Sequence, residues 1–146
     1  LSTYGCGFKP SLTESNLNFS IKVDNKTGNE AINSKIENQL KILNGIKKIF
    51  KIDINSSETK NILSKDSKGD PAIMMMIIKL NYNLIENSKI LVNRTLIERK
   101  TYNNISDKFE LRKSEEILRD NLVENFIEDI INSASNLIEN PMINDN

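Results

Sequence analysis

The sequence predicts an α+β fold, a two-layer sandwich in which two helices pack on one face of a four-stranded mixed sheet, in the order β-α-β-β-β-α. Two observations carry this prediction. Four segments alternate apolar and polar residues with a period of two, and two longer segments place apolar residues three and four apart. Amphipathic strands and helices each have one apolar side to bury, and a two-layer sandwich buries both. With 146 residues, the chain is expected to form a single domain over residues 17–140.

The first strand is predicted over residues 17–24, where apolar and polar residues alternate. The segment 25–28 is expected to break it, and Asn29 is a suitable N-cap for a helix through about Leu43. A second strand is predicted where residues 50–55 alternate again. The first strand–helix–strand unit is expected to be a right-handed crossover, which makes its two strands parallel.

The middle of the chain is predicted to form an antiparallel meander. Residues 55–71 are rich in serine, lysine and aspartate, so a long polar connection is expected there. Strands are predicted over residues 72–85 and 89–102, and the short turn at residues 86–88 joins them as a hairpin.

The last predicted element is a long helix from about Asp107 to Asn140, with Ser106 as its N-cap. Residues 141–146 follow Pro141 and are expected to fray. One apolar stripe of the helix is expected to face the sheet: Leu111, Leu118, Leu122, Phe126, Ile130, Ala134 and Leu137 or Ile138. The helix carboxylates are interpreted as its solvated side: Glu115, Glu116, Glu124, Glu128 and Asp129.

Composition excludes several kinds of chemistry. The chain has 20 Lys and Arg against 20 Asp and Glu, so its net charge supplies no general attraction to nucleic acid, and no nucleic-acid partner is expected. It has no histidine and one cysteine, which excludes Ser-His-Asp and Cys-His catalysis and multi-cysteine metal sites. Its five glycines form no phosphate-binding array. We therefore expect a protein that is not an enzyme and needs no cofactor or metal.

The lone cysteine, Cys6, follows Gly5 close to the start of the chain. A cysteine after small residues near an N-terminus is typical of a bacterial lipobox, where its thiol receives a diacylglycerol and it becomes the first mature residue. On this interpretation, residues 1–5 are the end of a signal peptide and residues 6–16 are a lipidated tether. Thr3 stands where a lipobox usually has leucine, and bulky Tyr4 follows it. The alternative is an ordinary free cysteine.

Three segments resemble the LptE family of lipopolysaccharide-assembly lipoproteins, especially its alphaproteobacterial form. The start Cys6-Gly7-Phe8-Lys9-Pro10 is similar to the CGF-x-P start of its mature members. Residues 33–40 resemble the family's first helix, and residues 99–116 resemble its passage into the last helix. The order of predicted elements also matches. Lys113-Ser114 departs from the Ala-Glu that is usual in this form of the family.

The resemblance implies a lipoprotein anchored through Cys6 to the periplasmic face of the outer membrane. Such a protein binds and plugs the LptD β-barrel and assists the assembly and transport of lipopolysaccharide to the cell surface. The alternative is a generic periplasmic α+β binding or adaptor lipoprotein with another partner.

The resemblance also implies where lipopolysaccharide binds. In the family, basic residues in the loop before the third strand and near the start of the last helix contact lipopolysaccharide. The corresponding positions here are Lys68 and Lys113, with Lys65 and Arg112 as alternatives in register. The loop that enters the third strand and the segment that leaves the fourth belong to the same end of an antiparallel pair, so Lys68 and Lys113 are expected to converge. The alternative is that both are ordinary solvated lysines.

Overall fold

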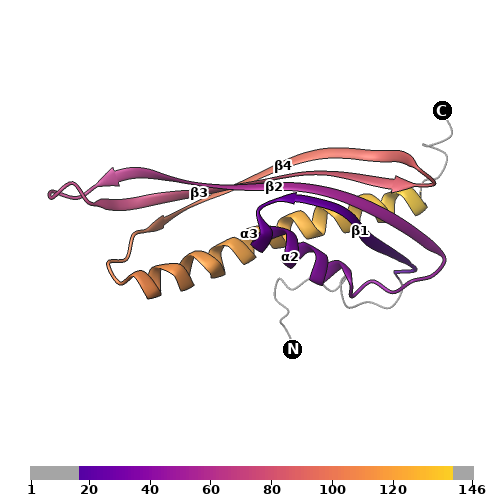
Figure 1. Ribbon diagram of the computed structural model, residues 1–146, viewed down its shortest axis with the longest axis horizontal. Coiled ribbons are helices and arrows are strands. Elements are labelled where there is room, and N and C mark those ends of the chain that lie inside the picture. Colours follow the sequence, from indigo (N-terminus) through magenta and orange to yellow (C-terminus); the bar gives the residue numbers. More distant parts are fainter. Residues whose placement is uncertain (1–16, 140–146) are drawn as a thin grey trace.

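The computed structural model describes residues 17–139; Cys6, the expected tether and the expected frayed tail lie outside the described residues. The elements are β1 (Phe19–Gly28), α2 (Glu30–Leu40), β2 (Lys48–Lys65), β3 (Pro71–Glu86), β4 (Lys89–Asn103) and α3 (Lys108–Glu139). The strands form one sheet in the order β1-β2-β3-β4, with β1 parallel to β2 and the other pairs antiparallel. Both helices lie on the same side of this long sheet (Figure 1). The predicted fold class and order of elements are confirmed.

The hydrophobic core fills the space between the sheet and the two helices. Ile52 of β2, Leu80 of β3 and Ile36 of α2 have no exposed surface and belong to one cluster with the stripe of α3. Within the predicted stripe, Leu122, Phe126, Ile130 and Ala134 are buried. Leu111, Leu118, Leu137 and Ile138 are half-buried. Val123, Ile127 and Ile131 are also buried, so the stripe is wider than predicted.

The connection from β1 to α2 is bonded to β2. Asn29 caps α2 as predicted, because its side-chain Oδ1 accepts from the Ile32 backbone N–H at 2.9 Å. The Asn29 backbone N–H donates to the Ser56 carbonyl at 3.1 Å. The prediction that residues 25–28 break the strand is wrong, since they stay paired with β2 up to Gly28 opposite Ser56. Gly28 then turns the chain with a φ of +96°.

The prediction of a long polar connection over residues 55–71 is also wrong. β2 continues to Lys65 and pairs with β3, so only residues 66–70 form a turn, closed by the Asp66 N–H donating to the Asp70 carbonyl at 2.8 Å. The polar composition of this segment does not prevent a strand, because the side chains of Glu58 and Lys60 face α3 and form ion pairs with its charged residues. The strand therefore needs no apolar side in this region.

Two helix ends also differ from the prediction. α2 ends at Leu40 rather than Leu43, and the chain leaves it through a tighter turn in which the Leu43 N–H donates to the Leu40 carbonyl at 3.0 Å. At the start of α3 the capping side chain is Asp107 rather than Ser106. Its Oδ1 accepts from the N–H groups of Phe109 and Glu110 at 2.9 and 3.1 Å. Over residues 17–139, no helix is long and apolar enough to cross a membrane.

Candidate functional site

The segments that carry Lys68 and Lys113 meet at one end of the sheet, which we call the far end (residues 57–78 and 97–118). The Asn104 backbone N–H donates to the Ala72 carbonyl at 2.9 Å, and the Asn104 side-chain amide donates to the Pro71 carbonyl at 2.9 Å. The chain that enters β3 and the chain that leaves β4 therefore lie side by side, as the predicted hairpin required.

The two lysines themselves occupy different parts of the far end. Lys68 is exposed in the turn between β2 and β3, where its backbone N–H donates to Asp66 Oδ1 at 2.9 Å. Lys113 is exposed on α3, with its Nζ 5.5 Å from the centre of the Phe109 ring, which is within the range of a cation–π contact. Figure 1 shows the β2–β3 turn at the tip of the sheet and the start of α3 below it. Neither lysine forms an ion pair among residues 17–139, and no bond joins them.

An open hollow of about 750 Å³ lies where these segments meet, and the cation that lines it is Lys108. Lys108 was not predicted as a site residue, because the local sequence does not show which side chains of the β4–α3 connection face the β2–β3 turn. Pro71 and Ala72 also line the hollow, and its other lining residues are polar: Asp66, Asp70, Asn103, Asn104 and Ser106.

A polar network at the far end joins β2 and β4 to α3. Glu115 is only 7% exposed; its Oε1 accepts from Lys60 Nζ at 2.9 Å and its Oε2 accepts from the Tyr102 hydroxyl at 2.6 Å. One turn later, Arg119 donates through Nε and through a terminal nitrogen to the two carboxylate oxygens of Glu58, the second at 3.1 Å. The interpretation of Glu115 as a solvated carboxylate is therefore wrong.

A second polar contact joins the middle of α3 to the sheet. Asp129 accepts from the Tyr82 hydroxyl at 2.8 Å and from two nitrogens of Arg94, both at 2.9 Å. Glu124 pairs with Lys35 of α2 at 3.2 Å. These two carboxylates also depart from the expected solvated side. The sequence does carry a signal that Glu115 is buried. Glu115 lies seven residues before Leu122, so both are on the buried side of the helix.

The charge state of the network follows from its contacts. Burial alone would raise the pKa of Glu115, but the hydrogen bonds from Tyr102 and Lys60 outweigh it and hold that pKa below its usual value. Burial and the neighbouring Glu115 carboxylate raise the pKa of the Tyr102 hydroxyl, so it stays a donor at neutral pH. Glu115 is thus a carboxylate that the fold holds ionised.

We expect acid to weaken the contact between α3 and the sheet. A group whose pKa is lowered on folding stabilises the fold above its unfolded pKa and loses that contribution as pH falls through the folded value. Glu115→Gln should therefore cost about 1–3 kcal/mol at pH 7 and flatten the loss of stability between pH 5 and pH 3. Urea unfolding of this variant at pH 5 and at pH 3 tests this. The matched control is Glu116→Gln, a change at the exposed neighbouring position. Equal pH dependence in the two variants would contradict it.

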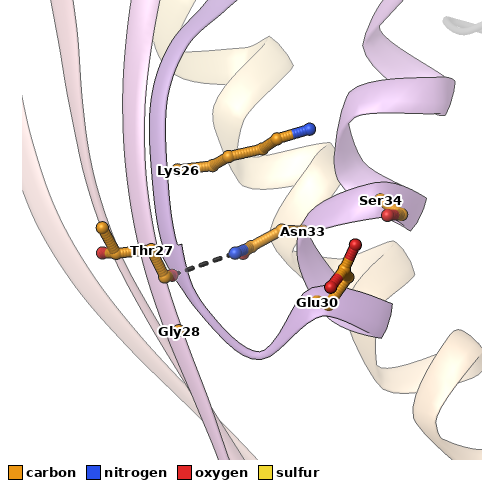
Figure 2. Close-up of a pocket in the computed structure, with 6 residues that line it drawn as sticks. All are labelled: Lys26, Thr27, Gly28, Glu30, Asn33 and Ser34. Carbon is orange, nitrogen blue, oxygen red and sulfur yellow. Dashed lines mark hydrogen bonds between the residues drawn. The ribbon is translucent and has the colours of Figure 1, made fainter.

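A second, smaller hollow of about 200 Å³ lies between the end of β1 and the start of α2, with Lys26, Gly28, Glu30, Thr27, Ser34 and Asn33 around it (Figure 2). The Asn33 side chain is buried; its amide donates to the Thr27 carbonyl at 2.9 Å and its Oδ1 accepts from the Ser56 hydroxyl at 2.7 Å. Lys26 donates to Glu37 of α2 at 2.5 Å. Lys26, Thr27 and Asn33 are therefore already bonded within the fold. Among residues 17–139 there is no group of three or more acidic or cysteine side chains arranged to hold a metal ion.

Comparison with known proteins gives a likeness of fold. No protein-family model and no curated protein matches the sequence. The structure of the rare lipoprotein B from Shewanella oneidensis is similar, with a TM-score of 0.58 at 12% identity over 82% of this chain and 97% of that one. The uncharacterized lipoprotein B from Nitrosomonas europaea is similar with a TM-score of 0.57 at 15% identity, over 92% of this chain and 94% of that one. The structure of a minor lipoprotein from Acinetobacter baumannii is similar with a TM-score of 0.52 at 12% identity, over 80% of this chain and 91% of that one. This chain therefore has a fold that it shares with several bacterial lipoproteins.

Proposed function

We propose that this protein is an outer-membrane lipoprotein of the LptE type, which plugs the LptD β-barrel and assists the transport of lipopolysaccharide without catalysing a reaction. The observation that carries the proposal is the fold shared with the Shewanella rare lipoprotein B over 97% of that chain. The segment Cys6–Pro10, which resembles the start of mature LptE, supports it independently of the fold.

The uncovered side of the sheet suits a water-filled lumen. A row of short polar side chains crosses all four strands in register, made by Thr27, Asn55, Asn81 and Thr95. Thr27 Oγ1 donates to Asn55 Oδ1 at 3.0 Å, and the Asn81 amide donates to Thr95 Oγ1 at 2.9 Å. Such a row is hydrated on its own and can make further hydrogen bonds to the polar inner wall of a barrel.

Affinity capture of the full chain from detergent-extracted membranes tests the barrel interaction. We expect a large outer-membrane β-barrel to be retained in a stable complex. Capture of a different partner would favour the generic adaptor, and would contradict the proposed plug.

The anchor is proposed to be at Cys6, the one cysteine of the chain. Mass spectrometry of the membrane-extracted protein should find a mature N-terminus at Cys6 carrying a diacylglycerol and an amide-linked acyl chain. Two or more acyl chains suffice for stable membrane attachment. An unmodified Cys6 with residues 1–5 still attached, in a host with normal lipoprotein processing, would contradict this.

Lys68 and Lys113 are proposed to contact the phosphates of lipopolysaccharide, since phosphate groups bind cationic donors strongly. Both are exposed and without ion-pair partners among the described residues. Lys68→Asp combined with Lys113→Asp should weaken lipopolysaccharide binding by at least about tenfold and leave capture of the barrel intact. The exposed lysines Lys22 and Lys79, changed to Asp, are the matched control. Unchanged lipopolysaccharide binding in a folded double variant would remove Lys68 and Lys113 from the site.

A further inference from the structure

We propose that the end of the molecule opposite Lys68 binds directly to an anionic phospholipid surface. This end, which we call the basic end, is formed by residues 41–51 and residues 86–90. The two segments are joined by the ion pair of Lys48 with Glu86 at 2.8 Å. Figure 1 shows them at the opposite end of the sheet from the β2–β3 turn. The proposal concerns the opposite end of the molecule from the lipopolysaccharide contacts, and it does not depend on those contacts or on the barrel.

Exposed isoleucines gather at the basic end. Ile46 is 86% exposed, the highest value among the large apolar residues that the structure describes as exposed. Ile42, Ile49 and Ile90 are each at least half exposed. Ile85 of β3 lies between the strands that carry Ile49 and Ile90. It pairs with Ile90 of β4 on one side and with Lys51 of β2 on the other, and Ile49 precedes Lys51 by two residues. Side chains of this kind gain free energy when they leave water for the boundary between lipid headgroups and acyl chains.

Four exposed lysines belong to the same two segments as these isoleucines. Lys41, Lys47, Lys51 and Lys89 are exposed, and none forms an ion pair among residues 17–139. The acidic groups near this end are Glu86, which Lys48 pairs, Glu37, which Lys26 pairs and whose pKa the Lys26 contact and the charge of Lys41 lower, and Glu139. The whole chain has no net charge, so this concentration of cations is local. Lysines that flank exposed apolar residues attract an anionic membrane surface while the apolar side chains enter it. The chemistry therefore fits anionic phospholipid headgroups.

The chain enters the domain at the same end. Leu17, the first described residue, lines a cavity together with Lys47 and Ile138. Cys6 precedes Leu17 by eleven residues (17 − 6), a length that spans at most about 40 Å when fully extended. An anchor at Cys6 would hold the basic end close to the bilayer. The proposed contact of the isoleucines and lysines with the membrane does not require this anchor.

Vesicle binding of the unlipidated full-length Cys6→Ser protein tests the proposal. The protein should co-sediment with phosphatidylcholine vesicles that contain about one-third phosphatidylglycerol, and not with pure phosphatidylcholine. Lys47→Gln combined with Lys89→Gln should weaken this binding by about 25-fold, at about fivefold for each lysine. The matched control, Lys65→Gln combined with Lys100→Gln at two exposed positions of the far end, should bind as the parent does.

The apolar part of the contact has its own pair of variants. Ile46→Ser should weaken binding to the same vesicles by at least about fivefold, whereas Ile117→Ser, 61% exposed on α3, should not. Both side chains are exposed, so neither change should lower the melting temperature. Absence of co-sedimentation, equal binding to pure phosphatidylcholine, or an equal loss in the far-end control would overturn the proposal. None of these outcomes bears on capture of the barrel.

Discussion

Ile130→Asp is expected to lower the free energy of unfolding by several kcal/mol, enough to leave much of the protein unfolded at 25 °C. Ile130 has no exposed surface and lies in the part of α3 that faces the sheet. An aspartate there must lose its hydration without a partner or take up a proton, and either costs a large part of the 5–15 kcal/mol that stabilises a typical domain. Thermal unfolding followed by circular dichroism measures the effect.

The matched control is Ile117→Asp on the same helix. Ile117 is 61% exposed, so its replacement by aspartate should change the melting temperature by no more than a few degrees. The two variants have the same change of residue type and the same helix propensity. A parent-like melt for Ile130→Asp would show that α3 does not pack on the sheet in solution.

The Gly28→Ala variant should be destabilised by about 3 kcal/mol or more. Gly28 has a φ of +96°, which costs an alanine about 1–2 kcal/mol by itself. A Cβ at this position would also stand 1.9 Å from the Ser56 carbonyl oxygen, so β1 and β2 would have to move apart where Asn29 bonds to Ser56. The main loss is expected in the pairing of these two strands.

Gly69→Ala separates backbone conformation from steric clash. Gly69 has a similar φ of +90°, but a Cβ there meets nothing within 4 Å. This variant should therefore lose only the conformational part, about 1–2 kcal/mol. If urea unfolding gives equal losses for the two variants, the close approach of Gly28 to β2 is not what constrains that turn.

Periodicity was sufficient to predict the elements that bury apolar side chains. The alternation of Phe19, Ile21 and Val23 located β1, and the three- and four-residue spacing in α3 identified the side that packs on the sheet. Because each of these elements has one apolar side, a single sheet covered on one face by both helices was the arrangement that buried them all.

Elements stabilised by polar contacts across the fold could not be predicted in the same way. Residues 57–65 have few apolar side chains, and their strand depends on pairing with β3 and on the contacts of Glu58 and Lys60 with α3. The partners Arg119 and Glu115 lie more than 50 residues away in the sequence, so no local pattern indicates them. Asp129 was assigned to solvent because its partners Tyr82 and Arg94 are also remote in sequence, whereas the spacing from Glu115 to Leu122 was a local signal that Glu115 is buried.

The candidate site was predicted only as far as topology allows. A hairpin between β3 and β4 places its two flanking segments at one end, and the hydrogen bond from Asn104 to Ala72 agrees with that. Which side chains line the hollow between them depends on the path of the turn. Lys108 lines it, whereas Lys68 and Lys113 do not.

β1 ends opposite Ser56, in the middle of the sheet, so the half of the molecule beyond Ser56 is less rigid than the half that contains β1. Beyond Ser56 the sheet has three strands instead of four, and α3 has no buried apolar side chain before Leu122. Amide hydrogens in this half should exchange through local opening at a smaller free energy than those around Phe126, where both helices and four strands meet. The half that carries Lys68 can therefore change its shape around a large ligand while the half that joins the rest of the chain stays folded.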